Sequence, residues 1–318
     1  MNFLENCSIL RGAAVSDEAC LIVALNDRLA EERTQHSIPL SCKGRAWSAI
    51  ADEPILPWIA ADIARTDDAS GALVIAGWGG QVLVIEGRAC RREAMSRRDA
   101  LAVSVIRSLC SIGNAVYAAG MSRQVYERTD ADGWRQLDDN MVNDSGAFGV
   151  GFNAIDGFDR TEIYAAGLDG EIWSYDGTTW RKIDAPTNVH LHCICCAADG
   201  VAHIGGRGGI LVSGRHDHWD ASHIGTDATI WDVHWFKGVL YLILDDGIWS
   251  YVDGAAEQIE GKLCQGDFLN FSSAGNRLWA FGRKKIACFD GSTWTGQRTD
   301  IARDGVQKSV LDVLDTRA

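Results

Sequence analysis

The stretch TEIYAAGLDGEIWSYDGTTWRKIDAP, residues 161–186, repeats the pattern of NAVYAAGMSRQVYERTDADGWRQLDD, residues 114–139. In each copy an apolar run ends at a glycine, a second run alternates apolar and polar residues, and a tryptophan starts a short final run. Looser copies cover residues 19–32, 73–87, 201–220, 239–254 and 277–294. The period of two along these runs indicates β-strands and argues against a helical solenoid, whose apolar residues would recur at i, i+3 and i+4.

The residue that closes the predicted second strand of each blade, at the end of the apolar run, recurs every 38 to 52 residues. In chain order these residues are Leu25, Gly77, Gly120, Gly167, Gly206, Leu244 and Gly282. A period near 40 with four short strands per copy is typical of β-propeller blades. We therefore predict an all-β protein, a single seven-bladed β-propeller of four-stranded antiparallel blades over residues 1–318, although the spacing also leaves a six-bladed ring open.

The repeat also sets the expected boundaries of the blades. They are residues 1–42, 43–99, 100–140, 147–186, 190–223, 228–262 and 267–300. Residues 305–318 are expected to supply a closing strand to the first, most divergent blade. Glycine at the end of the second strand should let neighbouring blades approach closely around the axis, and the tryptophan of the fourth strand should fill the wedge between adjacent blades.

Composition and charge exclude several classes of protein. The chain has 318 residues, and its 47% hydrophobic content is too high for a disordered chain. Its formal net charge of −13 argues against nucleic acid as a partner, because phosphate contacts need clustered Lys and Arg. The N-terminus has no secretory signal and no apolar run is long enough to span a bilayer. We therefore expect a cytoplasmic protein with no membrane contact, whose ten cysteines are reduced and mostly buried.

Two turns carry a resemblance to a known group of propellers. YDGTTW at residues 175–180 and FDGSTW at residues 289–294 resemble the Asp-box turn of BNR-type propellers, although Asp and Gly are adjacent here and separated by one residue in that family. The whole chain resembles the broad WD40/YVTN/BNR-like group of bacterial propellers. That resemblance implies the fold and says little about function.

In propellers generally, the second-to-third-strand turns and the blade-to-blade loops share one face, which we call the loop face. Its acidic, aromatic and methionine side chains suit a protein partner with a basic surface, whereas the bland alternative is that the acids solvate the rim. The candidate partner-binding residues are Trp78, Met121, Arg123, Asp138, Asp139, Asp144, Phe148, Asp169, Arg207, Asp245 and Asp246.

The sequence supports a catalytic or metal site less well than it supports this binding surface. HLHCICC at residues 190–196 could suggest zinc, but it lacks a second ligand pair and its side chains alternate between two sides of a strand, which favours buried packing. His203 takes the place of an aromatic residue in other copies, and Asp245–Asp246 matches a hairpin turn. We therefore predict no catalytic residues, no cofactor and no metal.

The sequence supports a non-catalytic binding module. A stand-alone acidic propeller without a catalytic motif resembles orphan propellers that act as antitoxins. This resemblance implies a cytosolic immunity protein that neutralises a secreted bacterial toxin by tight binding, and the acidic charge leads us to expect a basic toxin domain as the partner. The alternatives are a propeller enzyme, a lyase or hydrolase, which would use His203, Asp245 or Asp246 at the central channel, and a scaffold or assembly factor with several partners.

Overall fold

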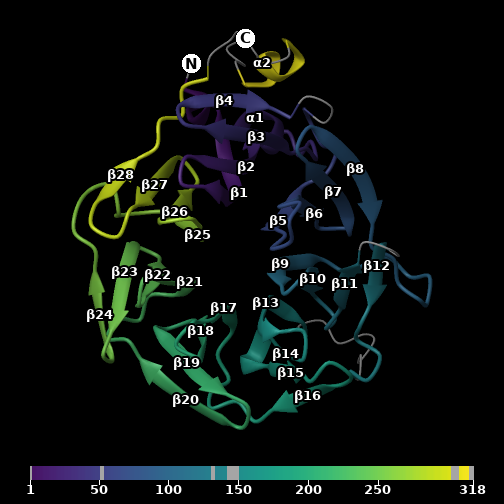
Figure 1. The fold of residues 1–318 in the computed structure, drawn as a ribbon, viewed down its shortest axis with the longest axis vertical. Coiled ribbons are helices and arrows are strands. Elements are labelled where there is room, and N and C mark those ends of the chain that lie inside the picture. Colours follow the sequence, from purple (N-terminus) through teal and green to yellow (C-terminus); the bar gives the residue numbers. More distant parts are fainter. Residues whose placement is uncertain (1, 51–53, 130–132, 142–149, 302–307, 315–318) are drawn as a thin grey trace.

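The computed structural model describes residues 2–50, 54–129, 133–141, 150–301 and 308–314. Within these residues, seven four-stranded antiparallel sheets stand as blades around a central axis (Figure 1). The all-β, seven-bladed propeller predicted from the repeat is confirmed, and the six-bladed alternative is wrong.

Each blade is built from four consecutive strands. Blades 1 to 3 contain β1 (Cys7–Ser16), β2 (Ala19–Asn26), β3 (Ile38–Lys43) and β4 (Ala46–Ala49); β5 (Ala60–Arg65), β6 (Leu73–Gly77), β7 (Gln81–Glu86) and β8 (Ala89–Ala94); and β9 (Ile106–Ile112), β10 (Ala115–Gly120), β11 (Val125–Thr129) and β12 (Gly133–Gln136). Blades 4 and 5 contain β13 (Phe152–Asp159), β14 (Glu162–Gly167), β15 (Ile172–Tyr175) and β16 (Trp180–Ile183); and β17 (Leu191–Cys196), β18 (Ala202–Gly206), β19 (Ile210–Arg215) and β20 (His218–His223). Blades 6 and 7 contain β21 (Ile230–Phe236), β22 (Val239–Leu244), β23 (Gly247–Val252) and β24 (Ala255–Gln258); and β25 (Phe268–Ala274), β26 (Arg277–Gly282), β27 (Lys285–Phe289) and β28 (Trp294–Gly296).

Helical structure is sparse. The described residues hold two short 3₁₀ turns, η1 (Phe3–Glu5) and η2 (Leu168–Gly170), and two short α-helices, α1 (Asp27–Glu31) and α2 (Lys308–Leu314). None of these helices is long and apolar enough to cross a membrane.

The hydrophobic core lies between neighbouring blades. The tryptophan that starts a fourth strand fills the wedge against the preceding blade, as predicted. Trp180 of blade 4, which is buried, packs against Tyr117 of blade 3, and its indole N–H donates to the carbonyl of Leu137 at 3.0 Å. Trp47 of blade 1 packs in the same way against Trp279 of blade 7. In these two wedges the indole N–H of a buried tryptophan bonds a backbone carbonyl of the neighbouring blade or of the segment that follows it, which ties the blades together, whereas the Trp294 N–H of blade 7 has no partner among the described residues.

The ring closes by packing of the two ends of the chain and does not exchange a strand. Blade 1 takes all four strands from its own sequence, and β1 lies beside β25 of blade 7 (Figure 1). The Trp47 indole N–H donates to the carbonyl of Arg298 at 2.7 Å, and the Gln297 amide donates to the carbonyl of Gly44 at 2.7 Å. The Asn270 side chain bonds both backbone groups of Gly12, at 3.1 and 2.8 Å.

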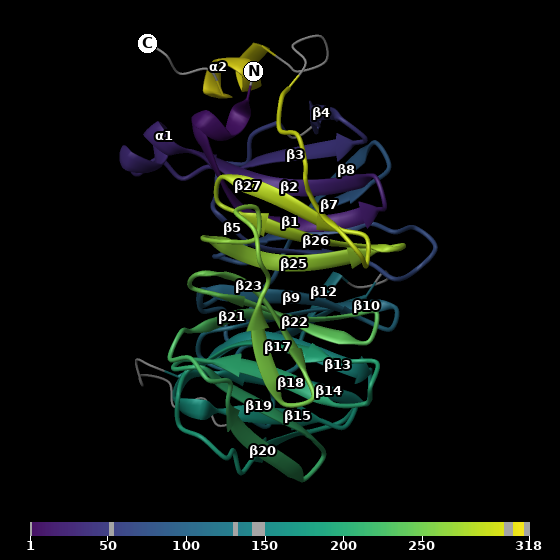
Figure 2. The ribbon, with the colours of Figure 1, turned by 90° about the vertical axis from the view of Figure 1, so that its left-hand side faces the viewer.

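Two expected boundaries differ from the structure. The fourth strand of blade 1 is β4 at residues 46–49, so the boundary predicted at 42/43 is wrong, because the hairpin turn at Gly44 (φ +63°) folds that segment back onto β3. The strand predicted within residues 305–318 is also wrong. Its described residues, 308–314, form helix α2, which lies beside η1 and blade 1 (Figure 2). Blade 1 already has four strands, and the spacing of Val310 and Leu314 places both on one helix face.

We expect Leu314→Ala to lower the free energy of unfolding by about 2 kcal/mol. Leu314 is fully buried against the core of blade 1. This loss lies at the low end for a buried leucine because a short terminal helix can relax around the cavity. Urea unfolding measures the loss, and Asp312→Ala on the exposed side of the same helix is the matched control. Equal stability of the two variants would show that α2 does not brace the ring.

Candidate functional site

The loop face is a continuous surface because its turns and loops bond to each other. In blade 2 the N–H of Trp78 donates to the carbonyl of Ile59 at 3.1 Å, and in blade 5 the N–H of Arg207 donates to the carbonyl of His190 at 3.0 Å. Each second-to-third-strand turn is thus held against the loop that enters the same blade. The rigid backbone of this face is suited to present side chains to a partner.

The predicted partner-binding residues fall into different environments. Trp78, Asp139, Asp169, Arg207, Asp245 and Asp246 are exposed. Met121 is half-buried, whereas Arg123 and Asp138 are buried. Asp144 and Phe148 lie outside the described residues. Six of the predicted side chains are therefore exposed to solvent, where a partner could reach them.

Arg123 forms a buried ion pair and does not face solvent. Its guanidinium donates to both carboxylate oxygens of Glu171, at 2.8 and 2.5 Å, and lies over the ring of Trp173. Burial alone would raise the pKa of Glu171, but the hydrogen bonds and charge of Arg123 outweigh it and hold that pKa below its usual range. The pair joins the turn of blade 3 to that of blade 4.

Asp138 is also a structural residue in this conformation. It is 3% exposed, and burial raises the pKa of its carboxyl group, while Gln136 and the nearby Arg97 act in the opposite direction. One of its carboxylate oxygens has no hydrogen-bond partner among the described residues. Asp139, the next residue, is exposed and forms an ion pair with Arg98. Only the second of these two acids can be a surface contact.

Trp231 is an exposed aromatic residue that the sequence reasoning missed. Its indole N–H donates to Asp245 at 2.6 Å, and the other oxygen of Asp245 accepts from the N–H of Thr229 at 2.9 Å. The ring packs against the ring of His192 at a tilt of 40°, with 4.8 Å between centroids. Asp245 thus fixes the indole in one orientation while 45% of Trp231 stays open to solvent.

Exposed hydrophobic side chains gather on this face. Among the described residues, the large hydrophobic side chains that are exposed are Trp78, Leu101, Val105, Trp231 and Val252. The first four lie on the loop face and only Val252 lies at the opposite end of its blade, after β23. Leu101 and Val105 belong to the loop between blades 2 and 3, whose weak repeat pattern gave the sequence reasoning no reason to single them out. Exposed apolar side chains are therefore concentrated on the loop face, as they are at protein-binding surfaces.

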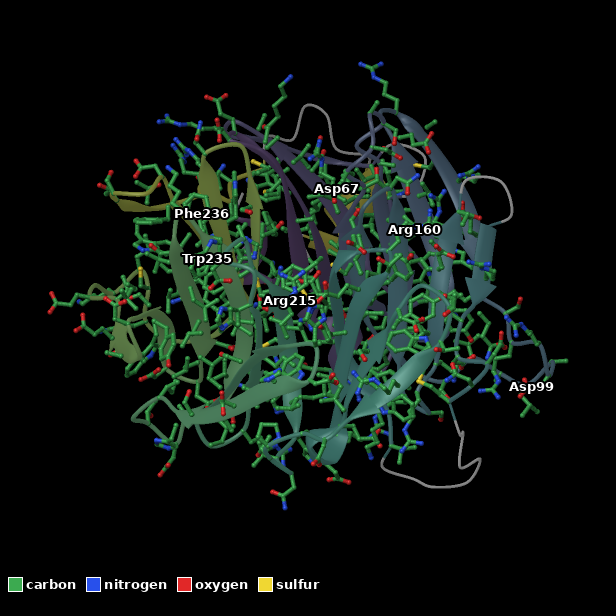
Figure 3. All side chains as sticks on the ribbon, turned by 60° about the horizontal axis from the view of Figure 1, so that its bottom comes forward. Asp67, Asp99, Arg160, Arg215, Trp235 and Phe236 are labelled. Carbon is green, nitrogen blue, oxygen red and sulfur yellow. The ribbon has the colours of Figure 1, made fainter. Side chains whose placement is uncertain are left out.

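The opposite face carries ion pairs that link neighbouring blades. Arg215 of blade 5 donates to both oxygens of Glu162 of blade 4 at 2.8 and 2.7 Å, and Arg160 of blade 4 pairs with the buried Glu127 of blade 3 (Figure 3). These guanidinium groups are already used within the ring. The charges of this face therefore have a structural role.

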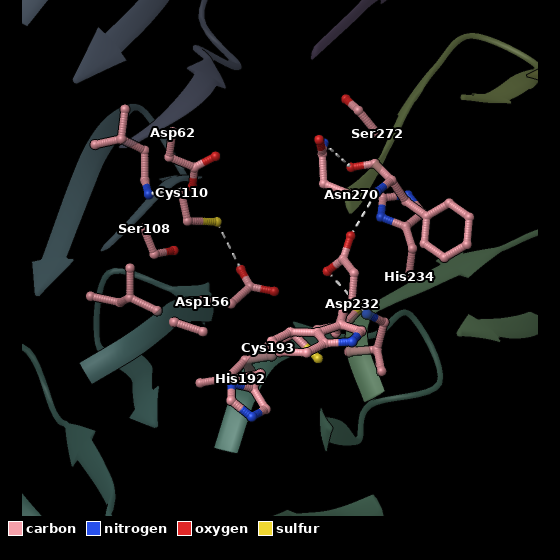
Figure 4. A pocket seen from close by; sticks show the side chains of 18 of the residues that line it. Asp62, Ser108, Cys110, Asp156, His192, Cys193, Asp232, His234, Asn270 and Ser272 are labelled. Atoms are coloured by element: carbon pink, nitrogen blue, oxygen red, sulfur yellow. Dashed lines mark hydrogen bonds between the residues drawn. The ribbon is translucent and has the colours of Figure 1, made fainter. Parts of the chain in front are cut away.

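A cavity of about 460 Å³ follows the axis of the ring and is lined by the first strands of the blades (Figure 4). A second hollow of about 420 Å³ forms its mouth on the loop face, where Asp245 and Arg283 contribute to the wall. Volumes of this size are typical of ligand pockets.

Three aspartates in the channel wall connect one blade to the next. Asp62 and Asp156 project from one side of the cavity and Asp232 from the other (Figure 4). Each accepts a backbone N–H from the first strand of the following blade. These bonds are Leu109 to Asp62 at 2.8 Å, Cys196 to Asp156 at 2.7 Å and Phe271 to Asp232 at 2.6 Å. Burial raises the pKa of all three carboxyl groups, and that of Asp232 to about 7.

The other residues weighed for chemistry are engaged in packing. His203 contacts Ser213 at 2.9 Å and Asp199 at 3.1 Å through its two ring nitrogens. Cys193 is buried, and burial raises the pKa of the Cys193, Cys195 and Cys196 thiols. The described residues contain no group of three His, Cys, Asp or Glu side chains placed to hold a metal ion.

Comparison with known proteins places the chain beside one bacterial relative and a broad set of propellers. No protein-family model matches the chain. It is 32% identical over 294 residues to the immune protein Tsi7 of Pseudomonas aeruginosa, which covers 91% of this chain and 96% of that protein.

Solved propellers resemble the chain in fold. The WD40 propeller domain of Doa1 has a TM-score of 0.66 at 10% identity and covers 89% of this chain and 92% of that one. YCF48 bound to D1 peptide has a TM-score of 0.56 at 15% identity and covers 76% and 82%. These low identities establish the propeller architecture alone, whereas the similarity to Tsi7 spans nearly both chains. The chain therefore belongs to the family of the immune protein Tsi7.

Proposed function

We propose that this chain is an immunity protein that binds a bacterial toxin through its loop face and thereby neutralises it in the cytoplasm. The observation that carries the proposal is membership of the family of an immune protein, with 32% identity over 91% of the chain. A propeller offers a rigid, wide surface for a protein partner, and the role needs no catalytic group.

The distribution of side chains supports the choice of face. Exposed Trp78 and Trp231 stand on different sides of the channel mouth, in the turn after β6 and at the start of β21. Aromatic side chains are the commonest energetic anchors of protein interfaces because they bury much apolar area with little conformational freedom to lose. Asp245 already fixes Trp231, so that binding needs little further ordering.

Electrostatics supports a basic partner. The net charge of −13 favours fast association with a positively charged protein. Asp169, Asp245 and Asp246 are exposed on the loop face. We therefore expect a binding rate that falls steeply as salt is added, because ions screen such attraction.

We expect Trp78→Ala and Trp231→Ala each to weaken binding to the toxin encoded beside this protein by about 30-fold, because each removes an anchor worth about 2 kcal/mol. Val252→Ala is the matched control, since Val252 is 48% exposed on the opposite face. Titration calorimetry measures the three affinities. If Val252→Ala weakens binding and the tryptophan variants do not, the partner uses the other face.

Protection of cells tests the function itself. A strain that expresses the neighbouring toxin should survive when this chain is co-expressed, and the two proteins should co-purify as one tight complex. Several simultaneous partners would favour a scaffold, and turnover of a small substrate in the channel would favour an enzyme. Failure both to protect and to bind the toxin would refute the proposal.

A further inference from the structure

A β-bulge occurs at the same place in all seven blades. Near the start of each first strand, one residue has no opposite residue on the second strand. The seven unpaired residues, which we call the bulge ring, are Leu10, Ala61, Arg107, Asn153, His192, Trp231 and Leu269. A bulge turns its side chain away from the regular alternation of the strand. Five of the seven, Arg107, Asn153, His192, Trp231 and Leu269, line the hollow at the loop-face end of the channel, whereas Leu10 and Ala61 pack in the core between blades.

The residues of the bulge ring differ in polarity from one side of the axis to the other. Blades 7, 1 and 2 contribute apolar residues, whereas blades 3 to 6 contribute Arg107, Asn153, His192 and Trp231. These four polar or aromatic residues all line the hollow at the channel mouth. If these side chains served only to fill the end of the channel, we would expect similar apolar residues in all seven blades. The concentration of donors on one arc points to a polar ligand.

Two groups on this arc lack partners within the described part of the chain. Arg107 is exposed and forms no hydrogen bond or ion pair there. The Nε2 atom of His192 is buried without a hydrogen-bond partner. A buried ring nitrogen without a partner costs free energy, so that a bound group that satisfies it would gain that energy back.

The local charge of the mouth is positive although the protein is acidic. Arg11, Arg107 and Arg283 line the hollow together with Asp245 and Asp267, but Arg11 pairs with Asp62 at 3.6 Å, so that Arg107 is the arginine left without a partner among the described lining residues. Arg207 is close enough to act on His192 electrostatically. The acids of the wall are already engaged. Asp245 holds Trp231, and Asp267 pairs with Arg283 at 3.0 Å. The polar groups of the mouth that lack a partner among the described residues are therefore the guanidinium of Arg107 and a ring nitrogen of His192.

We propose that the bulge ring is a subsite for a carboxylate of the protein partner, carried by an Asp or Glu side chain or by a chain end, with Arg107 as its anchor. This inference rests on the proposed function. A planar guanidinium matches a carboxylate in a two-bond geometry. Because Trp231 belongs both to the ring and to the exposed surface of the loop face, a protein that covers the face also covers the mouth.

The subsite and the acidic surface have different roles. The overall negative charge attracts a basic partner from a distance, whereas one carboxylate in a positive pocket fixes the orientation of the docked complex. A carboxylate elsewhere on the acidic face would be repelled, so that the pocket selects one register.

The test compares charge-matched variants of this chain against the toxin encoded beside it. We expect Arg107→Gln to weaken binding by 10- to 30-fold. Arg107→Lys should weaken it by less, since lysine keeps the positive charge but lacks the two parallel N–H donors of the guanidinium. Arg181→Gln is the control because it removes the same charge from an exposed side chain on outer strand β16, and it should change affinity by less than 2-fold. Thermal unfolding should be unaffected by Arg107→Gln, because Arg107 has no bonds to lose within the described residues.

A double-mutant cycle identifies the ligand. Each exposed acid of the toxin is changed to its amide, and its chain end is amidated. One of these changes should weaken binding to the wild-type chain but not to Arg107→Gln. Equal affinity of wild type and Arg107→Gln overturns this inference alone, and if inorganic phosphate then binds wild type but not the variant, the ring is a small-anion site. No binding of the toxin by the wild-type chain overturns the proposed function and this inference with it.

Discussion

Glu171→Ala should lower the free energy of unfolding by about 3 to 5 kcal/mol, the largest effect we expect from one side chain on the loop face. Its carboxylate is the partner of Arg123, and both side chains are at most 10% exposed. Removing the acid leaves a guanidinium buried without its counter-charge. For a chain of 318 residues the loss corresponds to a fall in melting temperature of roughly 4 to 8 °C.

Two further variants separate the ion pair from other causes. Asp217→Ala breaks the pair of Arg181 and Asp217, whose side chains are 59% and 71% exposed, and should cost less than about 0.5 kcal/mol. Arg123→Met combined with Glu171→Leu should recover most of the lost stability, because apolar side chains of similar size need no counter-charge. If Glu171→Ala unfolds at the same urea concentration as Asp217→Ala, the buried pair adds nothing to stability.

The same ion pair shows where sequence reasoning about the site reached its limit. Arg123 and Arg207 both occupy a turn between second and third strands, and both were predicted to face a partner. The structure exposes Arg207 and buries Arg123. The difference lies in Glu171, which is 48 residues away along the chain and reaches Arg123 only because blades 3 and 4 are neighbours. A turn sequence carries no information about the blade beside it.

The fold was largely predictable because the repeat encodes it locally. The glycine that ends the second strand is a good example, since a Cβ at Gly167 would lie 1.9 Å from the carbonyl oxygen of Gly151. That close contact is with the loop entering the same blade, so glycine is needed here for an approach within its own blade and not for the approach of neighbouring blades that the sequence led us to expect. Leu244 holds this place in blade 6, which shows that the backbone there leaves more room.

The bulge ring was not predictable. One extra residue in a strand changes which side chains alternate inward, and the sequence alone does not mark where the alternation shifts. Trp231 was therefore not singled out from the sequence, whereas the structure places it in a bulge that lines the channel mouth. The seven bulges could have been found only from the pairing of first and second strands, which the structure supplies.

The stability advantage of the wild-type chain over Asp232→Asn should shrink by up to about 4 kcal/mol as pH rises from 4 to 8. Asp232 lies in the channel wall, where burial raises its pKa from 3.8 to about 7. Between these values the folded chain holds a proton that the unfolded chain has released, so the free energy of unfolding falls with rising pH across this window. Above pH 7 the carboxylate is ionised in both states and its full burial cost is present.

The difference between the two proteins isolates this group from others that titrate in the same window. Burial lowers the pKa of His192 and His234 to about 4, and these histidines make the folded chain less stable as pH falls below 6.5, which opposes the effect of Asp232. Both histidines remain in Asp232→Asn, so their contribution cancels when the two urea-unfolding curves are subtracted at each pH. Asparagine cannot accept both N–H groups that Asp232 accepts, from Val233 and Phe271. This loss adds a cost that is the same at every pH and does not change how the difference in stability depends on pH.

Asp220→Asn, on the exposed side of β20, is the control, and its difference in stability from the wild-type chain should not change with pH. A flat difference for Asp232→Asn as well would show that this carboxyl group ionises as it does in the unfolded chain, and that the channel wall imposes no burial cost on it.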